Sequence, residues 1–182
     1  MKVLPRLLPV LLLYLLWTGQ VISAQNQTDT LNISQPPEGE LSREALKKVA
    51  KDIRKLERNP LASDADVAIA NLITWITGSP DIHFTLCPAV VSPIMNSGNP
   101  YANQLLSQYI LSSAATKIEQ PDRAGDMVFI HTEGMKAAVK SYQLIKDEKG
   151  RDARMRYMNK LSRKLKRGKF ENYMSNTLQE CQ

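Results

Sequence analysis

The sequence predicts an all-α fold, a compact bundle of five or six helices that follows a signal peptide and a short flexible linker. Apolar residues recur every three or four positions along most of the 182-residue chain. No segment alternates apolar and polar residues as a half-buried strand does, and no internal repeat is present. We therefore expect residues 42–182 to form a single helical domain, with residues 1–24 and 25–41 outside it.

The N-terminus has the order of a secretory signal. Residues 7–24 are uncharged, follow Lys2 and Arg6, and end at Ser23 and Ala24. The strongly apolar part, residues 7–17, is shorter than the roughly 20 residues that a bilayer-spanning helix needs, which disfavours an uncleaved anchor. We expect cleavage after Ala24, or after Ser23, and a secreted or periplasmic protein with no remaining transmembrane span.

Residues 25–41 are rich in Gln, Asn, Thr, Ser and Pro and predict a flexible polar linker. Asn26 and Asn32 each begin an N-glycosylation sequon. These sequons would be used only in a host that glycosylates exported proteins, and otherwise are chance matches in an Asn- and Thr-rich segment.

The first two helices are bounded by recognisable residues. Ser42 is the expected N-cap of a helix that ends at Asn59 and Pro60. A second helix begins at Ser63 or Asp64 and extends to residue 78. It has almost no polar face, which predicts a place at the centre of the fold.

Prolines interrupt residues 79–100, but the residues between them are strongly apolar, so buried turns or short helices are expected there. Asn99 and Pro100 predict the start of a helix that runs to residue 119. Further helices are expected at about 122–146 and 151–167, and a short helix after Gly168.

The two cysteines, Cys87 and Cys181, predict a disulfide, because an exported protein encounters an oxidising environment. Such a bond would fix the C-terminal helix to the apolar connector and stabilise the fold by about 4 kcal/mol in the chain-entropy model. A free thiol, an intermolecular bond and a metal site with His83 are the alternatives. One Cys and one His are too few ligands to predict a metal centre, and no cofactor is expected.

Catalytic motifs are absent from the sequence. It contains no Gly-x-Ser-x-Gly elbow, no phosphate-binding glycine loop and no zinc-protease His pair. His131 falls on an apolar stripe and is most simply a hydrogen-bonded core residue. A small exported hydrolase or thiol enzyme built on Cys87, His131 and His83 is the alternative hypothesis.

The main functional hypothesis comes from the distribution of charge. Residues 149–169 contain ten Lys or Arg residues and one acidic residue, Asp152. The predicted helix 151–167 is amphipathic, with five basic residues on the arc opposite its apolar residues: Arg156, Lys160, Arg163, Lys164 and Arg167.

This pattern predicts an exported helical binding or scaffold domain whose basic helix holds an anionic membrane surface, an acidic polysaccharide or an acidic protein. Nucleic acid is not an expected partner of an exported protein. A purely structural interpretation is that the apolar arc packs on the domain while the basic arc is solvated.

Overall fold

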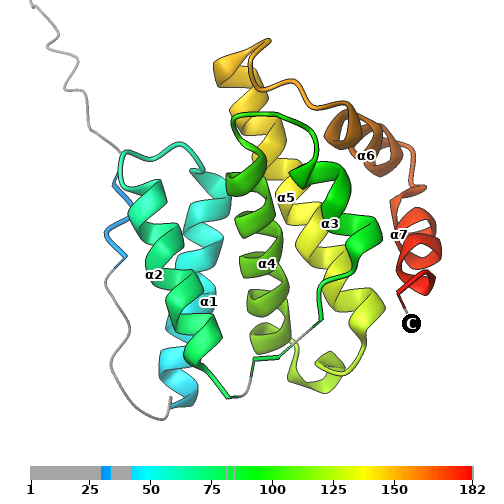
Figure 1. Ribbon diagram of the computed structural model, residues 1–182. Coiled ribbons are helices and arrows are strands. Elements are labelled where there is room, and N and C mark those ends of the chain that lie inside the picture. Colours follow the sequence, from blue (N-terminus) through cyan, green and yellow to red (C-terminus); the bar gives the residue numbers. More distant parts are fainter. Residues whose placement is uncertain (1–29, 34–41, 81, 84, 182) are drawn as a thin grey trace, which may run out of the picture.

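The computed structural model describes residues 30–33, 42–80, 82–83 and 85–181, and this part of the chain is all-helical, as predicted (Figure 1). It contains seven α-helices and one 3₁₀ helix, slightly more than the five or six helices expected. The predicted signal peptide and most of the predicted linker lie outside the described residues, as does Asn26. None of the described helices is long and apolar enough to cross a bilayer.

The first two helices begin and end close to the predicted residues. Helix α1 spans Arg43–Arg58, and the Ser42 hydroxyl caps it by accepting the backbone N–H of Ala45 at 3.2 Å. Helix α2 spans Ala65–Gly78. The Asp64 carboxylate, just before α2, does not cap that helix and instead accepts the backbone N–H groups of Leu31 and Asn32, both at 2.8 Å.

The proline-rich connector contains one helix, α3 (Pro88–Met95), which begins with Pro88 at a position where the missing N–H costs nothing. Helix α4 spans Ala102–Glu119. Its first residue is two positions later than the predicted start at Pro100, although the side-chain oxygen of Asn99, the predicted N-cap, accepts the backbone N–H of Tyr101 at 3.0 Å. The short 3₁₀ helix η1 (Pro121–Arg123) follows α4.

Two predicted helix starts are wrong. Helix α5 spans Met127–Lys149 rather than starting near residue 122, because Asp126 provides the cap: its carboxylate accepts the Phe129 N–H at 2.9 Å. Helix α6 spans Arg156–Lys166 rather than starting at residue 151. The buried hydroxyl of Tyr142 lies 3.1 Å from the N and 3.4 Å from the O of Met155, which fixes that residue in an extended conformation before the helix.

Helix α7 (Phe170–Gln179) completes the fold, and the disulfide joins its end to the start of α3. The sulfur atoms of Cys87 and Cys181 are bonded, with their Cα atoms 5.6 Å apart. This is the pairing predicted from the sequence. Gly168 provides the left-handed turn between α6 and α7, with φ of 62°.

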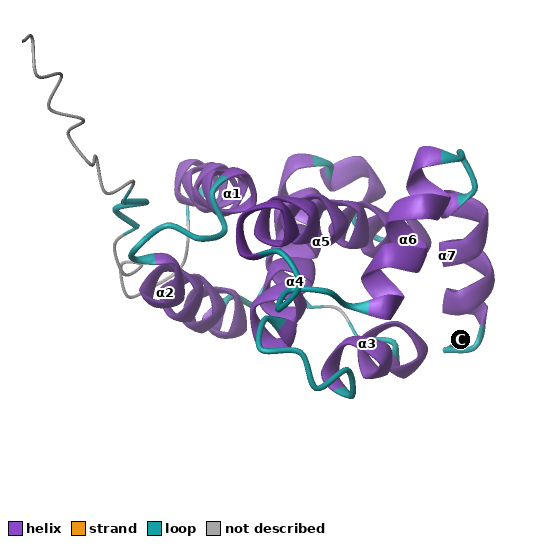
Figure 2. Ribbon diagram, turned by 90° about the horizontal axis from the view of Figure 1, so that it is seen from above, coloured by secondary structure: helices purple, strands orange, loops and turns teal. Residues whose placement is uncertain are grey.

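Helices α4 and α5 form the central pair of the bundle (Figures 1 and 2). Helices α1 and α2 pack on one side of it, and α3, α6 and α7 on the other. Helix α2 is therefore peripheral, which corrects the expectation that it lies at the centre. Its outer face is mixed: Val67 is 62% exposed, and Asp66, Ala70 and Thr74 are also exposed.

The central pair is close-packed because small residues line the seam between α4 and α5. A Cβ atom added to Gly134 would lie 2.0 Å from the Ser113 hydroxyl oxygen and 2.9 Å from the Tyr109 backbone oxygen. Real side chains do not approach so closely, so the two helices have this separation only because residue 134 is glycine.

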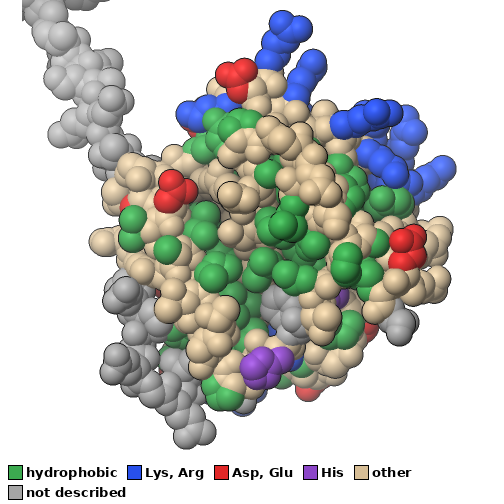
Figure 3. All heavy atoms as spheres, viewed as in Figure 1, with side chains coloured by type: hydrophobic (Ala, Val, Ile, Leu, Met, Phe, Trp, Pro, Cys, Tyr) green, Lys and Arg blue, Asp and Glu red, His purple; other side chains and the backbone are tan. Residues whose placement is uncertain are grey.

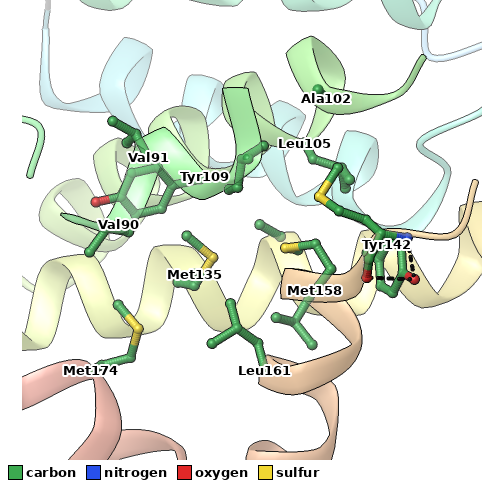
Figure 4. Packing of buried hydrophobic residues seen from close by; sticks show 14 of the residues in the cluster. Val90, Val91, Ala102, Leu105, Tyr109, Met135, Tyr142, Met158, Leu161 and Met174 are labelled. Carbon is green, nitrogen blue, oxygen red and sulfur yellow. Dashed lines mark hydrogen bonds between the residues drawn. The ribbon is translucent and has the colours of Figure 1, made fainter. Parts of the chain in front are cut away.

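The core divides into two clusters on opposite sides of α4. One contains residues of α1 and α2 with Leu31 and Ile33, and the other contains residues of α3, α5, α6 and α7. Figure 4 shows part of the second cluster, where Met135, Met158 and Leu161 lie between the helices and all three are fully buried.

Candidate functional site

The basic residues predicted to bind an anionic partner lie on α6 and at its end. We call Arg156, Lys160, Arg163, Lys164 and Arg167 the cationic strip. Four of them are exposed and Lys164 is half-buried. Figure 3 shows Lys and Arg side chains gathered over α6 and the turn before it, at the upper right. The helix is about 16 Å long, so the strip is a narrow line of charge on a convex surface.

The cationic strip is not neutralised by neighbouring carboxylates. Among the described residues, no Asp or Glu oxygen lies within 4 Å of a nitrogen of the strip. The nearby acidic residue of α7, Glu171, is paired with Lys136 at 2.7 Å, and Lys136 also pairs with Glu133 at 2.7 Å. The positive field of the strip is therefore available to a partner.

One aromatic residue orients the strip, and sequence analysis missed its role. The Nζ atoms of Lys160 and Lys164 lie 4.8 and 4.5 Å from the centre of the Tyr173 ring on α7. Nothing in the position of Tyr173 along the sequence places it between two lysines of the preceding helix. A fixed ring beneath two ammonium groups limits the directions in which they point.

Stabilisation of α6 itself explains the positions of only some basic residues in the cationic strip. Positive charges in the last turn of a helix interact favourably with the helix dipole, and Arg163 and Lys164 lie there. Arg156 is in the first turn, where a positive charge is unfavourable, and Lys160 is in the middle. The continuation of the strip to the start of α6 therefore needs an explanation other than local stabilisation.

The other predicted candidates meet in a separate place. Cys87, Cys181, His83 and His131 all line one pocket of about 1260 Å³ between α2, α4, α5, α7 and the connector before α3. Most of its described lining is apolar, including Ile73, Ile76, Ile110 and Leu178. The central face in Figure 3 shows the corresponding concentration of hydrophobic side chains between α2 and α3.

The geometry in this pocket is that of a structural site. His131 is 2% exposed, and its Nδ1 shares a 2.5 Å hydrogen bond with the Tyr109 hydroxyl. Burial lowers the pKa of His131 below its usual value, and a hydrogen bond with the backbone of Thr85 opposes that effect. Burial also raises the pKa of the Tyr109 hydroxyl. Both side chains are therefore neutral at pH 7.

Cys87 and His131 do not form a nucleophile and base in this structure. The sulfur of Cys87 is bonded to Cys181, so it provides no thiolate, and His131 interacts with Tyr109 and Thr85. Within the described residues, no group of three or more His, Cys, Asp or Glu side chains is placed to hold a metal ion.

Comparisons with protein-family models, with curated proteins and with solved structures give no significant match to this chain.

Proposed function

We propose that this protein is an exported helical binding protein that attaches to an extended polyanion, such as a sulfated or carboxylated polysaccharide, through the cationic strip on α6. The observation that carries the proposal is the line of Lys and Arg residues without carboxylate partners among the described residues. The disulfide supports an exported location, because such bonds persist in oxidising environments.

The environment of α6 favours a soluble polyanion over a membrane. A helix that inserts into a bilayer surface needs an exposed apolar face. The apolar face of α6 is in the core instead, with Met158 and Leu161 fully buried. Attraction is then electrostatic, and a convex strip about 16 Å long suits a linear chain of anionic groups.

The test is heparin binding to the purified protein over a series of salt concentrations. Arg163→Glu with Lys164→Glu should weaken binding at least about 30-fold at low salt, taking about 1 kcal/mol for each of the two cations lost, and the two new carboxylates add repulsion. The matched control is Lys48→Glu with Lys140→Glu, which makes the same change in net charge at two exposed positions on α1 and α5. It should change the affinity less than threefold.

Three results would contradict the proposal. Equally weak heparin binding by both double variants would show that only net charge matters, and this result removes the role of α6. Absence of binding to the unaltered protein at low salt does the same. Binding to vesicles that contain anionic lipid, without binding to heparin, would replace the polysaccharide with a membrane surface.

A further inference from the structure

A second basic surface, distinct from the cationic strip, lies along α1. A groove of about 760 Å³ separates α1 from the C-terminal end of α4 and η1. Its floor is apolar. Ala50 and Ile82 are buried, and Leu46 and Ile118 are half-buried. We call this region the α1 groove.

The rim of the α1 groove is cationic. Six Lys or Arg residues line it, against one described acidic residue, Glu119. Glu119 is already paired with Arg54 at 2.7 Å. Of the remaining cations, Lys117 donates to the backbone oxygen of His83 at 2.8 Å. The other four are exposed and have no carboxylate partner among the described residues: Arg43, Lys47, Lys51 and Arg58.

Helical spacing aligns three of these cations. Arg43, Lys47 and Lys51 are four residues apart, so their side chains leave α1 on the same side at intervals of about 6 Å. Leu46 and Ala50 lie next to this line and form part of the floor. The groove therefore presents a row of positive charge beside a continuous apolar surface.

The groove is elongated. Its α1 lining extends from Arg43 to Arg58, which is about 22 Å along a helix axis. A single extended chain can therefore lie along the groove, with its apolar part on the floor and a charged end at the cationic rim.

We propose that the α1 groove binds a long-chain carboxylate, a free single-chain fatty acid, with its acyl chain on the apolar floor and its carboxylate beside the row of Arg43, Lys47 and Lys51. An acyl chain gains about 0.8 kcal/mol for each buried methylene, and a polysaccharide has no group that would gain from this floor. The carboxylate meets unpaired cations, so both parts of the ligand have a complementary surface. This site is independent of the polyanion site on α6.

The test uses oleate, below the concentration at which it aggregates, with isothermal titration calorimetry. On the unaltered protein, oleate should bind at least ten times more tightly than methyl oleate, which has the same chain without the charge. This comparison needs no mutation. Equal affinity for the acid and its ester would contradict the proposal, as would the absence of oleate binding.

Variants then locate the site. Lys47→Glu with Lys51→Glu should weaken oleate binding at least about 30-fold, because two cations worth about 1 kcal/mol each are lost and two carboxylates that repel oleate are added. The control Lys48→Glu with Lys140→Glu should change it less than threefold. If the Lys47 and Lys51 reversal fails to fold, as judged by circular dichroism, Lys47→Gln with Lys51→Gln replaces it and should remove most of the preference for oleate over its ester.

Two further variants separate the competing sites. Val128→Gln alters the lining of the larger pocket beside the disulfide, and Arg163→Glu with Lys164→Glu alters α6. Neither should affect oleate binding. Loss of binding in Val128→Gln with no effect of the Lys47 and Lys51 reversal would assign oleate to the other pocket and overturn the inference. Heparin binding is measured on the same variants and tests the proposed polyanion site on α6 independently of oleate binding.

Discussion

The two sides of the bundle are stabilised by different kinds of interaction. The α1–α2 side has a polar network, in which Arg54 pairs with Glu57 and Glu119 and its guanidinium also donates to the Thr116 hydroxyl at 3.2 Å. The α3–α7 side has a larger apolar cluster and the disulfide. Each side includes one basic helix.

The comparison of α1 with α6 shows that a sequence pattern does not determine a surface by itself. Both helices have an apolar stripe and a basic face. Helix α1 lies beside the end of α4, so its basic face borders a groove with an apolar floor. The apolar residues around α6 are in the core, so its basic face is a convex ridge. Neighbouring elements decide whether such a helix suits an amphiphile or a polyanion.

The largest expected effect is loss of the disulfide. Cys87→Ala with Cys181→Ala should lower the free energy of unfolding by about 4 kcal/mol, because the bond closes a loop with a sequence separation of 94 residues. Urea denaturation measures this change in the free energy of unfolding of the whole protein. Hydrogen exchange should accelerate in α3 and α7 more than in α1 and α2, and uniform acceleration would contradict the division into two sides.

The seam between α4 and α5, the central pair on which both sides pack, gives the next largest effect. Gly134→Ala should lower the free energy of unfolding by about 1–2 kcal/mol, since the clash of the new Cβ atom with α4 exceeds the roughly 1 kcal/mol gained in helix propensity. Gly78→Ala is the control, because a Cβ atom there meets nothing within 4 Å. Hydrogen exchange should accelerate on both sides of the bundle in Gly134→Ala. An unchanged or raised melting temperature for that variant would show that the seam adjusts without cost.

A pH effect is expected on the α3–α7 side. Burial lowers the pKa of His131, so below the unfolded-state pKa of about 6.5 the unfolded protein binds more protons than the folded one. Stability is therefore lost as the pH falls through the folded-state pKa, at no more than about 1.4 kcal/mol for each pH unit. His131→Gln should reduce this slope between pH 6.5 and 5, as measured by denaturation at each pH. Identical slopes would exclude His131 as the source.

The smallest expected effect is a loss of stability on the α1–α2 side, and it occurs at a lower pH than the effect of His131. The backbone N–H groups of Leu31 and Asn32 lower the pKa of the Asp64 carboxyl. The stabilisation it provides is present above the unfolded-state pKa of about 4 and is lost as the pH falls below it. Because this carboxylate is solvent-accessible, Asp64→Asn should cost less than about 1 kcal/mol at pH 7 and should reduce the acid sensitivity. Asp66→Asn serves as the control, and an equal change in that variant would remove the specific role of Asp64.

The elements that could be predicted are those whose boundaries depend on nearby residues. Ser42, the Asn59-Pro60 pair and Gly168 each act within one helical turn, and each marks a boundary as expected. The start of α6 depends on the hydroxyl of Tyr142, which is 13 residues from Met155. The start of α5 had a local signal, the cap at Asp126, but the apolar stripe alone extended the predicted helix too far.

The same distinction applies to the sites. The five residues of the cationic strip belong to one amphipathic helix and could be identified from spacing, although their binding role stays a prediction. The α1 groove could not be identified, because Ile82 and Ile118 join Leu46 only through the tertiary fold. The disulfide could be inferred from the number of cysteines and the expected compartment. The position of the disulfide beside His83 and His131 could not be inferred from the sequence.

The bond between Cys87 and Cys181 also makes the segment between them a covalent ring. A protease that cuts the backbone once within residues 88–180 leaves a single molecule with both parts attached, so in an oxidising environment such a cut does not release the cationic strip. A cut between α1 and α2 has the opposite result, because no second covalent connection among the described residues holds α1 to the rest. One cleavage can thus detach the α1 wall of the α1 groove, with its row of cations, whereas one cleavage cannot detach the α6 surface.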